Sequence, residues 1–126
     1  MPARGDWHRA GVAAAAETFR HSFVAFAGTA PVSAALPSSA AGLRVDGDGV
    51  VTTSVRDRDG RIEVRFVALQ PFATTAVVSA GRPLRGAWLA DLRGRSGVSL
   101  PVGPDGAVRV DLRAFEIATL QLDLER

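Results

Sequence analysis

Hydrophobic and polar residues alternate along most of the chain after Leu43. Between residues 61 and 69, Ile62, Val64 and Phe66 fall on one face, and arginine and glutamate side chains fall on the other. A period of two residues is typical of a β-strand that buries one face and keeps the other polar. The pattern therefore predicts an antiparallel strand over 61–69.

The same alternation recurs in further segments, which are separated by short runs rich in glycine, proline and aspartate. Strands this short, at intervals of about 8 to 12 residues, are typical of an all-β fold. We therefore expect a mainly β fold, an antiparallel β-sandwich of about seven to nine short strands with one N-terminal α-helix, and an open barrel is the alternative. The further strands are expected at 51–56, 74–80, 87–92, 98–102, 107–112 and 116–124.

Two of these segments allow finer predictions. In 51–56, the odd-numbered residues should share one face, as the simple alternation requires. In 116–124, the even-numbered apolar residues should point inward and the polar residues at 119, 121 and 123 outward. Phe115 and Ile117 are apolar at the opposite parity, which indicates a bulge or crossing near Ala114.

The first part of the chain follows a different pattern. Apolar residues from Val12 to Phe23 are spaced three and four residues apart, and an alanine run adds helix propensity. Asp6 is the expected N-cap of this helix. The chain of 126 residues is expected to form a single β-sandwich domain over 1–126: a helical lead-in at about 7–21, a loop at 28–42 and strands within 43–124.

Composition excludes several function classes. The chain has no cysteine, so disulfide scaffolds, thiolate zinc sites and cysteine nucleophiles are excluded. The net charge is only +2, and between residues 56 and 65 arginines alternate with acidic residues, so no basic patch for nucleic acid is expected. The longest apolar run, 12–16, is far shorter than the roughly 20 residues that span a bilayer. We expect no nucleic-acid or membrane partner and, since the N-terminus does not resemble a signal peptide, a cytoplasmic protein.

The sequence shows no pattern typical of a catalytic or metal site. His8 and His21 would lie about 20 Å apart on one helix, too far for one metal ion. The D-x-D-G runs at 46–49 and 57–60 lack the later glycine and acidic positions of a calcium loop, and they predict hairpin turns instead. The G-x-S-G run at 94–97 is one residue short of a hydrolase elbow. We expect no catalytic residue, no metal ligand and no cofactor in this chain.

Trp88 is the candidate for contact with a carbohydrate. A tryptophan on the face of a β-sandwich can stack its flat apolar ring on a sugar. Trp88 lies between Ala87 and Leu89 in a predicted strand, and tryptophan is buried on average, so a core position or an interdomain contact is the favoured interpretation.

Several short motifs follow one another in a distinctive order. They are the opening 7–12, the pair Leu36-Pro37, the segments 49–55, 60–66 and 88–95, and the ending Arg113-Ala114-Phe115-Glu116-Ile117-Ala118-Thr119-Leu120. In this order and spacing, the chain resembles the C-terminal β-domain of bacterial α-mannosidases of glycoside hydrolase family 38. The resemblance covers roughly residues 7–124.

The resemblance implies a zinc-dependent retaining α-mannosidase as the parent enzyme. In that family the nucleophile and the zinc ligands lie in an N-terminal catalytic domain, which no segment here matches, so zinc is expected there and not in this chain. We expect a non-catalytic accessory domain that packs on the catalytic domain and helps to frame its sugar site. The alternatives are a stand-alone module that binds mannose-containing carbohydrate or a protein-interaction β-sandwich, and a free-standing enzyme is least favoured.

An accessory domain should expose an apolar patch where it contacts its partner. The candidates for this patch are Trp7, Phe23, Phe26, Phe72 and Trp88.

Overall fold

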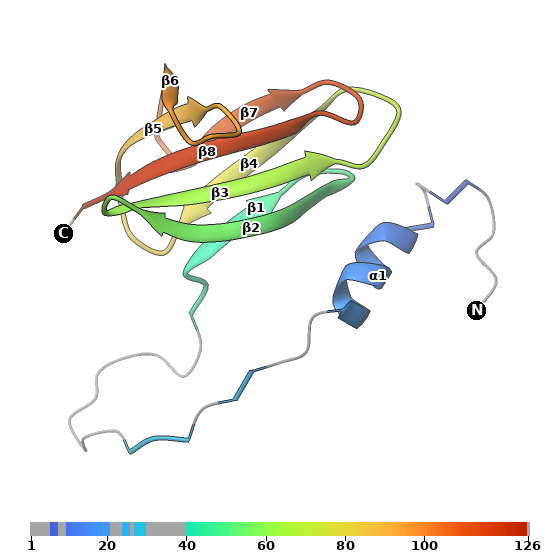
Figure 1. The fold of residues 1–126 in the computed structure, drawn as a ribbon, viewed down its shortest axis with the longest axis horizontal. Helices are drawn as coiled ribbons and strands as arrows, with labels where there is room; N and C mark the ends of the chain where they lie inside the picture. The colour runs from blue at the N-terminus through green and yellow to red at the C-terminus, as the bar shows by residue number, and fades with distance from the viewer. Residues whose placement is uncertain (1–5, 8–9, 21–23, 26, 30–39, 126) are drawn as a thin grey trace. The chain divides into compact units, whose positions relative to one another are not determined.

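The computed structural model describes residues 6–7, 10–20, 24–25, 27–29 and 40–125 (Figure 1). These residues belong to two compact units, one within 1–40 and the other within 41–126. The first unit contains the helix α1 (Val12–Arg20), and the second contains the eight β-strands of the described residues. That 1–126 forms a single domain stays a prediction.

The helix is shorter than the lead-in expected at 7–21. The backbone N–H of Ala10 donates to the carbonyl of Asp6 at 3.0 Å, which closes one separate turn. Gly11 then takes a left-handed φ of 65°. A left-handed residue interrupts a right-handed helix, so α1 begins at Val12 and Asp6 does not cap it.

The helix ends at Arg20, and Arg20 forms an ion pair with Glu17 at 3.2 Å. Phe23, Phe26 and most of the loop expected at 28–42 lie outside the described residues.

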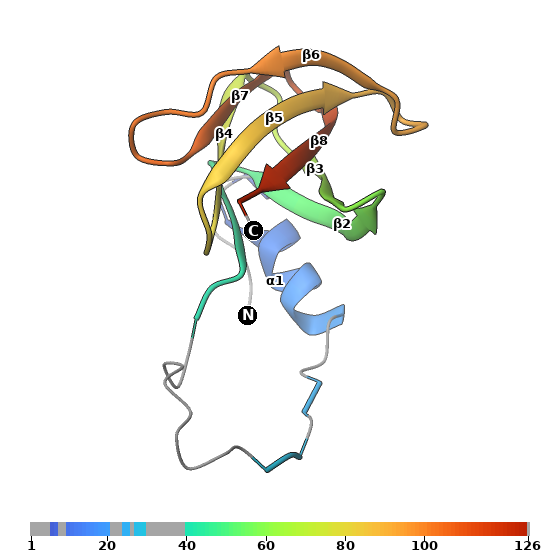
Figure 2. The same ribbon diagram turned by 90° about the vertical axis from the view of Figure 1, so that its left-hand side faces the viewer.

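The second unit is the predicted antiparallel β-sandwich (Figures 1 and 2). One sheet has three strands in the order β1-β4-β7, and the other has five in the order β2-β3-β8-β5-β6. The strands are β1 (Leu43–Asp46), β2 (Val50–Arg58), β3 (Arg61–Ala68), β4 (Thr74–Ala80), β5 (Leu84–Ala90), β6 (Ser96–Leu100), β7 (Val108–Leu112) and β8 (Ile117–Leu124).

The hydrophobic core lies between the two sheets. Phe66 of β3 and Leu120 and Leu122 of β8 are fully buried there, and Val78 and Val108 contribute from the three-stranded sheet. Burying one such side chain contributes about 1.5–3 kcal/mol. The inward faces predicted for β3 and β8 are therefore confirmed.

Two predicted strands are displaced toward the N-terminus. The strand expected at 87–92 is β5, and the strand expected at 98–102 is β6. The carboxylate of Asp91 accepts hydrogen bonds from the backbone N–H groups of Arg93 and Arg95, each at 2.9 Å, and this turn forms directly after β5. An aspartate that accepts a hydrogen bond from the backbone N–H two residues ahead starts a turn. The strand therefore ends before the glycines at which the sequence pattern predicted the turn.

A β-bulge at Thr53 overturns the prediction for the first hairpin strand. Val51 pairs with Val67 on one side of the bulge, and Val55 pairs with Val64 on the other. One extra residue inverts the parity of a strand, so Val51 and Val55 lie on opposite faces and not on one.

Of the two irregularities expected near Ala114, the structure has the crossing and not the bulge: the chain turns there from β7 of the three-stranded sheet into β8 of the five-stranded sheet. The N–H of Glu116 donates to the carbonyl of Arg113 at 3.1 Å. Phe115 takes a left-handed φ of 57°, which is uncommon for a side chain of this size.

Replacing Leu120 by alanine should lower the free energy of unfolding by about 2–5 kcal/mol, because lost burial and a new cavity add. Leu92 is the matched control, since it is 63% exposed in the β5–β6 loop, and Leu92→Ala should change stability by no more than about 0.5 kcal/mol. Urea unfolding followed by circular dichroism measures both variants. If both variants lost the same free energy of unfolding, Leu120 would not belong to the hydrophobic core.

Candidate functional site

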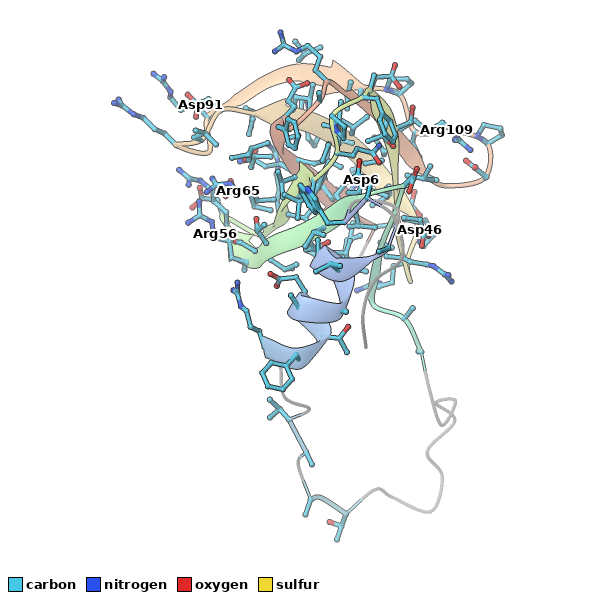
Figure 3. The ribbon with its side chains drawn as sticks, turned by 90° about the vertical axis from the view of Figure 1, so that its right-hand side faces the viewer. Asp6, Asp46, Arg56, Arg65, Asp91 and Arg109 are labelled. Atoms are coloured by element: carbon cyan, nitrogen blue, oxygen red, sulfur yellow. The ribbon has the colours of Figure 1, made fainter. Side chains whose placement is uncertain are left out.

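The outward face of the five-stranded sheet is polar, yet part of it is buried. Glu63 of β3 and Gln121 of β8 are each only 3% exposed. The loop of residues 91–95 covers them: Gln121 Nε2 donates to the carbonyl of Gly94 at 2.8 Å, and Arg65 donates to the carbonyl of Leu92 at 3.0 Å. Figure 3 shows Arg56 and Arg65 on this side of the sandwich, with Asp91 at the start of the covering loop.

Glu63 is the centre of a hydrogen-bond network on this face. Arg56 Nε donates to Glu63 Oε1 at 2.7 Å, and Gln121 Nε2 donates to Glu63 Oε2 at 2.9 Å. The hydroxyl of Ser96 in turn donates to Gln121 Oε1 at 2.5 Å. The network therefore links four strands, β2, β3, β8 and β6.

The pKa of Glu63 lies below its ordinary value. Burial by itself would raise this pKa, but the hydrogen bonds from Gln121 and Arg56 and the charges of Arg56 and Arg58 together lower it by more. The carboxylate is therefore ionised at neutral pH, with its burial offset by close donors.

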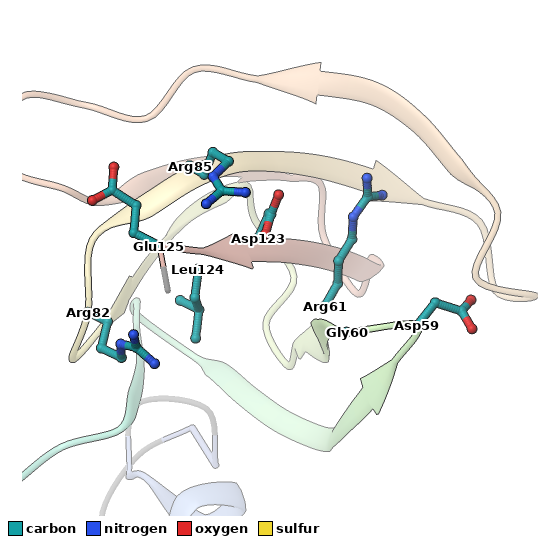
Figure 4. Close-up of a pocket in the computed structure, with 8 residues that line it drawn as sticks. All are labelled: Asp59, Gly60, Arg61, Arg82, Arg85, Asp123, Leu124 and Glu125. Atoms are coloured by element: carbon teal, nitrogen blue, oxygen red, sulfur yellow. The ribbon is translucent and has the colours of Figure 1, made fainter.

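A groove opens beside this network at one end of the five-stranded sheet (Figure 4). Its volume is about 510 Å³, and it lies between the β2–β3 turn, the β4–β5 turn and the end of β8. We call it the arginine groove; its lining residues are Asp59, Gly60, Arg61, Arg82, Arg85, Asp123, Leu124 and Glu125. A smaller hollow of about 240 Å³ shares Asp59 and Arg61 with it and reaches Ser96 and Gln121.

Trp88 lies on the outward face of β5, where it pairs with Gln121, and not in the core. The guanidinium carbon of Arg61 is 4.2 Å from the centre of the Trp88 ring and covers one face of it. Gly86 allows the ring to lie close to the strand, because a Cβ at that position would come within 2.5 Å of the ring. Trp88 is therefore half-buried by Gly86 and Arg61.

At the other end of β3 and β8, three large apolar side chains are exposed. Phe72, Phe115 and Ile117 are 48%, 53% and 54% exposed. The loops that carry the two phenylalanines lie side by side in Figure 1, and the N–H of Phe115 donates to the carbonyl of Gln70 at 3.2 Å. We call these three residues the apolar end patch.

The sequence predicted only part of this patch. Phe72 was among the candidates, whereas Phe115 and Ile117 were not. The sequence feature that could have indicated them is that both are apolar at the parity opposite to the core residues of this strand. Of the other candidates, Trp7 is 48% exposed in the first unit, and Phe23 and Phe26 lie outside the described residues.

The residues considered as metal ligands do not form a site in the described part of the chain. His8 and His21 lie outside it. The two D-x-D-G runs form turns, as predicted, with left-handed φ angles of 65° at Gly49 and 80° at Gly60. Only the turn at 57–60 is a hairpin, because the run at 46–49 joins β1 and β2, which belong to different sheets. Among the described residues, no group of three or more histidine, aspartate or glutamate side chains could hold a metal ion.

The described residues also contain no helix that is long and apolar enough to cross a membrane.

Comparisons with known proteins identify no relative of this chain. No protein-family model, no curated protein and no solved structure matches this chain. The likeness to family 38 mannosidases therefore rests on the motifs alone.

Replacing Glu63 by glutamine should lower the free energy of unfolding at pH 7 by about 1–3 kcal/mol, because Arg56 loses its charged partner. The folded-state pKa of Glu63 is lowered, so its contribution is present above the unfolded pKa of about 4.3 and is lost as pH falls through the folded pKa. The difference between the two proteins should therefore shrink from pH 7 toward pH 3. Urea titrations at several pH values measure it.

Asp46→Asn is the control for this experiment. Asp46 pairs with Arg44 at 3.0 Å, but both side chains are exposed, so its removal should cost less than about 1 kcal/mol. A Glu63→Gln effect as small as that of Asp46→Asn would show that the network is not a stabilising element.

Proposed function

We propose that this chain is a non-catalytic accessory β-sandwich domain that packs on a catalytic domain of a glycoside hydrolase. The apolar end patch is the observation that carries the proposal. Large apolar side chains that are exposed together at one end of a folded domain often mark a protein contact. In such a contact, Phe72 and Phe115 would be the aromatic anchors, which are the residues that dominate binding energy in many interfaces.

The turn around Phe115 supports the role of an anchor. A left-handed phenylalanine costs about 1–3 kcal/mol and persists only where its surroundings hold it. The carboxylate of Glu116 accepts a hydrogen bond from the N–H of Arg113 at 2.7 Å, and the carbonyl of Gln70 accepts one from Phe115. The backbone of a turn fixed in this way loses little conformational entropy on binding.

The nature of the partner is inferred from the motif resemblance. It makes the partner a zinc-dependent α-mannosidase catalytic domain, which would supply the metal ion and the nucleophile. This chain would then contribute to the frame of the sugar site and carry no catalytic residue.

The alternative is a stand-alone carbohydrate-binding module, with Trp88 as its contact residue. The position of Trp88 beside the arginine groove favours this alternative. Arg61 covers one face of the ring, so a sugar that stacks on that face would first have to displace the guanidinium.

The docking proposal is tested by chemical cross-linking of the tagged chain in an extract of its source cells, followed by mass spectrometry. We expect a glycoside hydrolase polypeptide, and we expect its yield to fall at least tenfold for the double variant Phe72→Ser/Phe115→Asn. Asparagine is chosen because it tolerates a left-handed φ and so preserves the turn.

Val98→Ser is the matched control, because Val98 is another exposed apolar residue, 66% exposed on β6. It should leave the yield unchanged. Recovery of no glycoside hydrolase, or equal recovery with the double variant, would refute the docking proposal.

The carbohydrate-binding alternative is tested by an amide NMR titration with mannose and short manno-oligosaccharides. Under the docking proposal the spectrum should not move at millimolar sugar, because the sugar site needs the catalytic domain. Saturable shifts that cluster around Trp88 would favour the alternative instead.

A further inference from the structure

The arginines of the groove lack acidic partners. Arg61, Arg82 and Arg85 form no ion pair within 4.0 Å with any residue that the structure describes. By contrast, Arg95, Arg109 and Arg113 each pair with a carboxylate within four residues of sequence. Guanidinium groups without a close ion pair that line one concave space favour an anionic ligand.

The lining also contains three acidic residues, so its formal charge is zero, and the direction of each side chain decides which charge faces the groove. Figure 4 shows Asp123 between Arg85 and Arg61, whereas the carboxylates of Asp59 and Glu125 point away from that space. Arg82 lies apart from them, beyond Leu124, so two positive groups flank one negative group around Asp123. The surplus suits a ligand with a single negative charge better than a compact dianion, which Asp123 would repel.

The side chain of Arg61 is held in place before any ligand binds. Its guanidinium lies over Trp88, and Arg61 Nη1 donates to the hydroxyl of Ser96 at 3.3 Å. That hydroxyl is held by Gln121, which is buried and bonded to Glu63. A guanidinium has five N–H donors, so most of those of Arg61 are left for an oxyanion, and little side-chain entropy is lost on binding.

The remaining lining residues indicate the chemistry of the uncharged part of the ligand. The carboxylate of Asp123 accepts hydrogen bonds and so suits the hydroxyl groups of a sugar. Leu124 provides an apolar wall, and a volume of about 510 Å³ is within the usual range of ligand pockets.

We propose that the arginine groove binds a sugar acid, with the carboxylate of the sugar held by Arg61 and Arg85 and a neighbouring hydroxyl held by Asp123. Two parallel N–H···O bonds from one guanidinium to one carboxylate give such a contact both strength and direction. The site lies at the end of β3 and β8 opposite the apolar end patch, so it is independent of the docking proposal.

The proposal is tested on the full chain by NMR titration at physiological salt with D-glucuronate, D-glucose and inorganic phosphate. Glucuronate should produce saturable shifts at the Trp88 indole and at the amides of Arg61, Arg85 and Asp123. Glucose, which lacks the carboxylate, should bind at least tenfold more weakly. Phosphate should also bind more weakly, because of its second charge.

Variants of the groove residues locate the contact. Arg61→Ala and Arg85→Ala should each weaken glucuronate binding about tenfold or more, and Arg61→Lys should restore only part of it, because lysine lacks the paired donors. Asp123→Asn should reduce the preference for glucuronate over phosphate. Arg109→Ala is the matched control: Arg109 pairs with Asp105, lies on the other side of the sandwich in Figure 3, and should not affect binding.

Dispersed spectra of the variants verify that they fold. The proposal is overturned if glucuronate shifts do not saturate, if glucose binds as tightly as glucuronate, or if folded Arg61→Ala and Arg85→Ala bind as the control does.

Discussion

The buried carboxylate of Glu63 needs hydrogen-bond donors, and the groups that supply them organise the outward face of the five-stranded sheet. An ionised carboxyl group without partners would be very costly in a buried position. Arg56 and Gln121 satisfy it, and Gln121 in turn bonds the carbonyl of Gly94. The β5–β6 loop is thereby held against the sheet, and the hydroxyl of Ser96 is placed where it can orient Arg61. The proposed anion contact of Arg61 thus depends on this structural network.

The same two strands present different chemistry at their two ends. At one end of β3 and β8, arginines surround a groove; at the other, Phe72, Phe115 and Ile117 are exposed. The sandwich core between these ends fixes β3 and β8 in register, which holds the two surfaces at opposite ends of the same strands. A domain of this kind can dock on a protein through one end and keep the other end free for a small ligand. The two proposals therefore concern separate surfaces and do not compete.

Local backbone geometry decides how both surfaces are presented. The bulge at Thr53 inverts the parity of β2, which brings Arg56 onto the face that carries Glu63. The left-handed Phe115 allows the chain to turn directly from β7 into β8. In each case one residue departs from regular geometry, and the departure places a side chain that regular alternation would have placed elsewhere.

The sequence by itself determined the class of fold, because alternation with a period of two specifies which face of each strand is apolar. It correctly predicted the core residues of β3 and β8 and the strand at 74–80. It could not determine that Glu63 and Gln121 are buried, since their cover comes from a loop about 30 residues distant in sequence from each, and hydrogen bonds across that distance leave no periodic signal. Nor could it bring Arg61, Arg85 and Asp123 together, because their proximity depends on the order of strands in the sheet. Strand pairing brings together residues that are far apart in sequence, and it depends on how the whole core packs. Only the tertiary structure therefore decides it.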